Sequence, residues 1–251
     1  MNVIQEFGTA LSLHGKAFSF IRKNGLSWTF LIPIALFLIL LTVGLYSIGE
    51  LTDYLTMKIL YNYVYDGFVS SLLLILFRIL FFIVIGMWGG YIIVIIMSPF
   101  LAYISEKTEK IITGNDYPFN LSQFINDVIR GILLALRNFC MEMLISIVFF
   151  LCSFFTAAMA APFVSVILFL VSAYFYGFSF IDYTNERRKL SVKQSVRYVS
   201  QRKAMSCGHG FIFALLLYIP VLGVALSSFY AIIATVAATM HVLEIENQQL
   251  A

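Results

Sequence analysis

The chain has 251 residues, of which 61% are apolar and 12% are charged, whereas charged residues make up about a quarter of a typical soluble domain. Its net charge of +3 is too small to indicate a nucleic-acid partner. The three cysteines, Cys140, Cys152 and Cys207, are widely separated, which favours a role as small apolar side chains. The composition predicts one membrane domain over residues 1–251 without a cofactor or metal.

Residues 1–27 are predicted to form an amphipathic segment on the cytoplasmic side of the membrane. One face of this helix carries residues at helical spacing, namely Ile4, Phe7, Leu11, His14, Phe18 and Ile21. The pair Asn24-Gly25 is a typical C-terminal cap.

Two long apolar runs follow, at 28–48 and 72–97. The first has 21 residues and no charge, and the second has 26 residues with Arg78 as its one charged residue. At about 1.5 Å per residue, each can cross a hydrocarbon core of about 30 Å. We therefore predict two long transmembrane helices. Arg78 either extends to the outer interface or contacts an anion in a pore.

Two later segments, 140–181 and 208–242, are predicted to be helical hairpins that enter from the cytoplasmic side. Residues 211–219 precede Pro220 and span only about 14 Å as a helix, so they cannot cross a bilayer. We expect at least one hairpin to penetrate partway. The alternative is two ordinary hairpins that are tilted and slightly short.

Two more amphipathic helices are predicted at the interface, at 121–136 and 191–202. Asn120 with Gln123, and Ser191 with Gln194, have the spacing of capping boxes. The basic side chains of the second helix favour contact with anionic lipid, or alternatively concentrate an anionic solute at a pore mouth. The distribution of Lys and Arg places 1–27, 98–139 and 182–209 in the cytoplasm and 49–71 outside. The prediction is thus an all-α, multi-pass integral membrane protein.

Short motifs in one register over residues 15–240 resemble the CysZ-type sulfate permeases, which share a membrane domain with etoposide-induced proteins. The matching residues are Pro99-Phe100, Glu106, Glu109, Thr113-Gly114, Asp127-Val128, Arg130, Asp182-Tyr183, Lys189, Lys193, Arg202-Lys203, Gly210, Ile219-Pro220 and Ala234-Thr235. The resemblance implies a homo-oligomer of the bacterial inner membrane, with two long spans and partly penetrating hairpins. It also implies passive uptake of sulfate for cysteine synthesis.

The chain departs from this family at its anion-binding motif. The family has a glycine followed by an arginine pair before the first span, with eight residues from that glycine to a proline. Here the spacing from Gly25 to Pro33 is kept, but Ser27-Trp28 replaces the arginines. Losing two charge-assisted hydrogen bonds, each worth about 1.5–3 kcal/mol, weakens a sulfate site by about a hundredfold or more. The expected anion contact is therefore Gly25, Leu26 and Ser27, with Arg22 and Lys23 supplying charge.

Several charged residues are candidates for a pore entrance. Glu106 and Glu109 either form a solvated helix face or pair with Arg130 or Arg202, and Asp182 caps a helix or pairs in the same way. The candidate set is Arg78, Glu106, Glu109, Arg130, Asp182, Arg202 and Lys203. His14, His209 and His241 share no spacing typical of a metal site, and no arrangement of residues indicates an enzyme. A membrane scaffold that does not transport is the alternative function.

Overall fold

The computed structural model describes residues 2–55, 67–115, 121–155, 161–219 and 222–250, together with Lys58. These residues form no strand, and nearly all of them are helical, which confirms the predicted fold class. The elements in chain order are α1 (Val3–Lys23), the 3-10 helix η1 (Leu26–Phe30), α2 (Leu31–Leu55), α3 (Gly67–Thr113), α4 (Leu121–Phe155), α5 (Ala161–Arg187), α6 (Val192–Ser200), α7 (Lys203–Leu217) and α8 (Gly223–Leu250).

Five described segments are long and apolar enough to cross a membrane. They are Leu26–Tyr54, Gly89–Thr113, Val128–Phe149, Pro162–Arg187 and Gly223–Gln248. The predicted span 28–48 lies inside the first of them. The predicted span 72–97 is part of α3, a helix of 47 residues that begins at Gly67 and ends at Thr113. The chain is therefore a multi-pass membrane protein by the length and composition of its helices.

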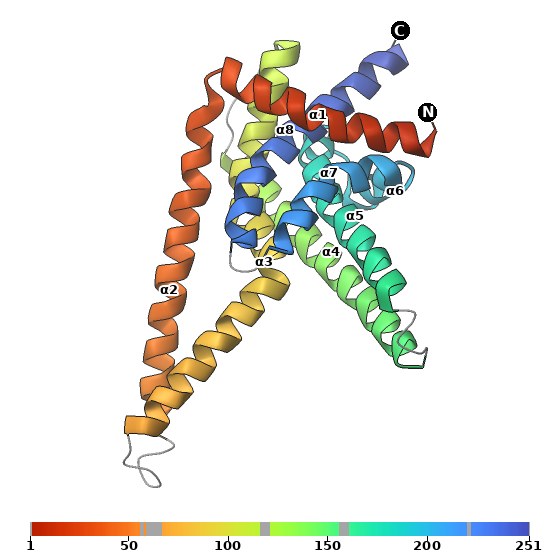
Figure 1. The fold of residues 1–251 in the computed structure, drawn as a ribbon. Coiled ribbons are helices and arrows are strands. Elements are labelled where there is room, and N and C mark those ends of the chain that lie inside the picture. Colours follow the sequence, from red (N-terminus) through yellow and green to blue (C-terminus); the bar gives the residue numbers. More distant parts are fainter. Residues whose placement is uncertain are drawn as a thin grey trace.

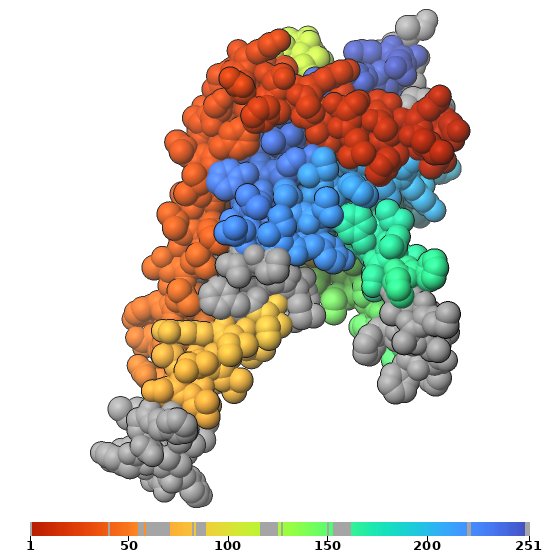
Figure 2. All heavy atoms as spheres, viewed as in Figure 1, coloured from red at the N-terminus to blue at the C-terminus, as the bar shows by residue number. Residues whose placement is uncertain are grey.

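The helices gather at one end of the molecule and diverge towards the other (Figure 1). Helix α2 and the first half of α3 form one long arm, and α4 and α5 form a second. Helices α7 and α8 lie between the arms. Figure 2 shows α1 lying across α7 and α8 at the end where the helices meet. Segments that are far apart in the sequence thus meet under α1.

The closest helix contact joins α5 and α7. A Cβ atom added at Gly177 would lie 1.7 Å from the Ser206 carbonyl oxygen, and one at Gly210 would lie 1.9 Å from the Ala173 carbonyl oxygen. Glycine at both positions lets the two backbones touch, as small residues do between membrane helices. This contact fixes α7, whose 15 residues span only about 23 Å. This helix begins before the predicted limb at 211–219 and is longer than the nine residues predicted, but it is still shorter than the about 20 residues that a span needs.

The predicted surface helix over 121–136 is not a separate element. Helix α4 runs without a break from Leu121 to Phe155. The sequence between Arg137 and Cys140 contains no Pro or Gly to end a helix, so the amphipathic and apolar segments join. Asn120, the proposed cap, lies outside the described residues. The capping box of Ser191 and Gln194 is confirmed, with 3.3 Å from Gln194 N to Ser191 Oγ.

The buried face of α1 differs from the predicted stripe. Its buried residues are Ala10, Leu13, His14, Ala17 and Ile21, while Ile4 and Phe18 are exposed. Alanine brings α1 close to α7, since a Cβ atom added at Gly208 would lie 2.6 Å from the Ala10 Cβ atom. The close contact between the helices therefore requires small side chains on the buried face of α1. A prediction that looks only for large apolar residues does not find them.

Candidate functional site

The turn between α1 and η1 carries the residues that are predicted to contact the anion. Asn24 ends α1, and its side-chain amide donates to the Phe20 carbonyl oxygen at 2.9 Å. Gly25 follows in the left-handed conformation at φ 68°, which suits glycine, so the predicted cap is confirmed. Arg22, Lys23 and Ser27 are exposed, whereas Leu26 is buried and anchors the turn.

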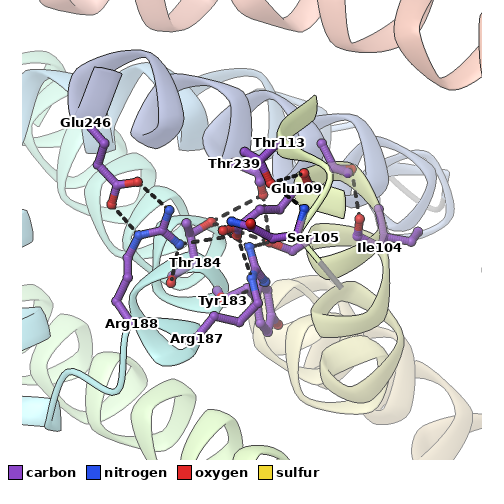
Figure 3. Close-up of polar contacts among 12 residues, drawn as sticks. Ile104, Ser105, Glu109, Thr113, Tyr183, Thr184, Arg187, Arg188, Thr239 and Glu246 are labelled. Carbon is purple, nitrogen blue, oxygen red and sulfur yellow. Dashed lines mark hydrogen bonds and ion pairs between the residues drawn. The ribbon is translucent and has the colours of Figure 1, made fainter. Parts of the chain in front are cut away.

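An ion-pair network that is buried at Glu109 and partly exposed at Glu246 joins α3, α5 and α8 (Figure 3). The Arg187 Nε atom donates to the Glu109 carboxylate at 2.8 Å, and an Arg188 nitrogen donates to the same oxygen at 3.3 Å. Arg188 also makes two hydrogen bonds to both carboxylate oxygens of Glu246. Two adjacent arginines at the end of α5 thus bridge carboxylates from α3 and α8.

Hydroxyl groups extend this network inward. The Arg187 guanidinium donates to Ser105 Oγ at 2.9 Å, and Ser105 Oγ lies 2.6 Å from Thr239 Oγ1. Thr184 Oγ1 is within 3.4 Å of both of these hydroxyl oxygens. All three hydroxyl residues are buried. The cluster links the same three helices through groups that both donate and accept hydrogen bonds.

A second ion-pair network attaches α4 and α6 to α5. Arg130 lies 3.1 Å from Asp182 and 3.6 Å from Glu186. Ser195 of α6 donates to the same Asp182 carboxylate and accepts a hydrogen bond from Asn185 at 2.9 Å. Across the two networks, the guanidinium groups of Arg130, Arg187 and Arg188 contact the carboxylates of Glu109, Asp182, Glu186 and Glu246. Among these described residues, four carboxylates therefore face three guanidinium groups, which leaves an excess of negative charge.

Neither alternative predicted for Glu109 matches its described contacts. The residue is buried and not on a solvated face. Its described ion pairs are with Arg187 and Arg188 and not with Arg130 or Arg202. Helix α5 continues to Arg187, six residues beyond the predicted end of its hairpin, and the added turns bring Arg187 and Arg188 beside α3. Arg130 pairs with Asp182 instead, so Asp182 acts as an ion-pair partner.

The remaining predicted entrance residues, Glu106, Arg202, Lys203 and Arg78, form none of the ion pairs described above. Glu106 is half-buried on α3, and Lys203 is exposed at the start of α7. Arg202 lies over the Tyr198 ring, 4.1 Å from its centroid. Arg78 is exposed on the first half of α3, among exposed residues that include Ile75 and Ile79. The structure does not bring Arg78 to the rest of the candidate set.

Sequence reasoning also missed an acidic residue in the middle of a membrane-spanning segment. Glu142 of α4 accepts hydrogen bonds from the Tyr91 hydroxyl of α3 and from Ser172 Oγ of α5. An ionisable residue at this depth is costly and commonly functional, and a carboxylate inside an apolar run was the available signal. Arg187, Arg188, Glu186 and Glu246 gave a weaker signal because charges at helix ends usually face solvent.

Comparisons with known proteins identify the family of the chain. No curated protein matches the chain. A family model, that of the sulfate transporter CysZ/etoposide-induced protein 2.4 family, matches residues 13–227. This match covers most of the 251 residues. It includes the turn at residues 22–27, here called the basic turn, helices α3 to α7, and both networks except for Thr239 and Glu246. The chain belongs to the sulfate transporter CysZ/etoposide-induced protein 2.4 family.

Proposed function

We propose that the protein is a passive permease for sulfate or a related oxyanion. It acts in the bacterial inner membrane as a homo-oligomer with its N-terminus in the cytoplasm. The observation that carries the proposal is the exposed turn of Arg22, Lys23, Gly25 and Ser27, directly before the first span of a chain in a sulfate-transporter family. Cationic side chains and the first backbone N–H groups of a helix suit a tetrahedral oxyanion.

The ion-pair networks are compatible with a conduction path from which the anion can dissociate. Conduction requires binding that is strong enough to admit an ion and weak enough to let it leave. Arg130, Arg187 and Arg188 already contact carboxylates, so they present little net positive charge to trap a divalent anion. In this proposal the networks hold the helix ends and shape the entrance, while the basic turn attracts the anion.

Uptake of radiolabelled sulfate into liposomes that contain the purified protein tests the function. We expect saturable uptake without ATP that excess unlabelled sulfate blocks, and phosphate and chloride as competitors define the selectivity. Hydrogen exchange supplies a test of the contact, since sulfate should slow exchange of the backbone amides of Gly25–Ser27. A well-folded sample with neither uptake nor protection would overturn the proposal.

Restoring the family's arginine pair should strengthen sulfate binding. The double variant Ser27→Arg/Trp28→Arg is expected to bind sulfate about a hundredfold more tightly, because each arginine adds a charge-assisted hydrogen bond. Isothermal titration calorimetry measures the change. The matched control is Gln5→Arg/Ser12→Arg, which adds the same charge at exposed positions in the first half of α1, away from the turn. Equal gains in both variants would show that only the overall charge matters.

A membrane scaffold is the second candidate, and the position of Trp28 favours it. The indole is half exposed and meets Phe100 edge-on at 6.2 Å between ring centroids, as expected of an anchor at the membrane interface. A scaffold gains no sulfate affinity from the arginine pair. The titration therefore separates the two functions.

A further inference from the structure

Three histidines from three helices meet beneath α1. His14 of α1, His209 of α7 and His241 of α8 are 5%, 0% and 2% exposed. The His14 and His209 ring centroids are 5.3 Å apart, and those of His209 and His241 are 5.2 Å apart. These three residues are the whole histidine content of the chain. Their positions in sequence gave no sign that they meet.

The contacts of the cluster favour neutral imidazoles. His209 Nε2 lies 3.0 Å from His241 Nδ1, so one ring donates a hydrogen bond and the other must accept it. Both His14 nitrogens and His209 Nδ1 are buried without a hydrogen-bond partner among the described residues. A proton added to the accepting ring breaks the shared hydrogen bond, and a proton added to His14 creates a buried charge.

The surrounding groups offer little compensation for such a charge. Tyr230 of α8 faces His14 at 5.4 Å between ring centroids, and its phenol is neutral at physiological pH. On the two helices that carry His14 and His241, Lys16 of α1 and Glu244 of α8 pair with each other at 4.0 Å, and both side chains are exposed. Cys207 of α7 donates to the Leu170 carbonyl oxygen of α5 instead. Within the described residues, no carboxylate forms an ion pair with any of the three rings.

We propose that His14, His209 and His241 form a pH-sensitive latch that holds α1 on α7 and α8 at neutral pH and releases it on acidification. Release would also move the α1–η1 turn, which carries Arg22 and Lys23 at the end of α1. The latch does not depend on which solute crosses the membrane. Its test is therefore independent of the proposed transport function.

The size of the effect follows from linkage. Burial lowers the pKa of His14 from 6.5 to about 4. The released state thus binds more protons than the docked state between these values, and docking weakens as the pH falls through this window. For His14 alone, the release equilibrium is expected to increase about 30-fold between about pH 7.5 and pH 5.

Hydrogen–deuterium exchange of the full chain in lipid nanodiscs measures this release. Protection factors are compared at about pH 7.5 and pH 5 after correction for the pH dependence of intrinsic exchange. We expect protection of α1 to fall about 30-fold, while protection of α5, which packs mainly on α7, stays constant. A fall of less than about threefold would overturn the proposal.

Two variants remove the titration of His14 in different ways. His14→Phe keeps an aromatic ring against His209 and Tyr230, and His14→Gln keeps a polar side chain if the phenylalanine fails to dock. Either docked variant should lose most of the pH response, and retention of the full 30-fold fall would contradict the latch. The matched control is Lys16→Gln, which removes the rim ion pair and should retain the response. If Lys16→Gln also loses the pH response, the response depends on the ion pair between Lys16 and Glu244 and the latch is contradicted.

Discussion

Replacing Glu109 with glutamine is expected to destabilise the protein by about 3–5 kcal/mol. The Glu109 side chain is 4% exposed and contacts the guanidinium groups of both Arg187 and Arg188. Glutamine retains the shape but removes the negative charge, so the buried guanidinium of Arg187 loses its ion pair with Glu109. Removing one partner of a buried ion pair costs more than the pair contributes, because the remaining charge is still desolvated.

The loss of stability is measured by thermal unfolding of the detergent-solubilised protein. After each heating step, size-exclusion chromatography gives the fraction that remains folded and monodisperse. The matched control is Glu246→Gln, which removes the other carboxylate of Arg188. Because the Glu246 side chain is 36% exposed, water replaces much of what is lost, and we expect a cost of about 1 kcal/mol or less. If Glu109→Gln is no more destabilising than this control, the network does not hold α3 to α5.

Replacing Gly210 with valine should have an effect of similar size through packing. The first added carbon would lie 1.9 Å from the Ala173 carbonyl oxygen and 2.6 Å from the Gly177 backbone nitrogen. Backbone atoms cannot rotate away as a side chain can, so α5 and α7 must separate. The expected cost is about 3 kcal/mol or more, and the variant should be recovered mainly as aggregate.

Gly15→Ala provides the control for this prediction. A Cβ atom at Gly15 would meet nothing within 4 Å, so alanine there should stabilise α1 by up to about 1 kcal/mol. Thermal unfolding of both variants in the same detergent gives the comparison. A stable, monodisperse Gly210→Val sample would show that the contact between α5 and α7 is looser than the structure has it.

The apolar runs predicted most of the fold because membrane spans depend on length and composition, which are local properties. The cap at Asn24-Gly25 and the capping box at Ser191 were predictable for the same reason. The basic turn was also within reach, since its spacing to Pro33 is a sequence property. Its role as the anion contact stays a prediction.

Contacts between distant residues were not predictable in the same way. Glu109 and Arg187 are separated by 78 positions, and their pairing depends on how far α3 and α5 extend beyond their apolar segments. Helix ends are the least certain part of a sequence-based assignment. The histidine cluster combines residues from α1, α7 and α8, so no spacing within one helix could reveal it.

The shortness of α7 has a consequence for how the chain is inserted during synthesis. A helix of 15 residues partitions into a bilayer poorly on its own, because about 20 are needed to span the hydrocarbon core. Its place is defined instead by the backbone contact of Gly210 with α5, a helix made earlier. We therefore expect α7 and α8 to enter the membrane together, packing against α5, which is synthesised before them.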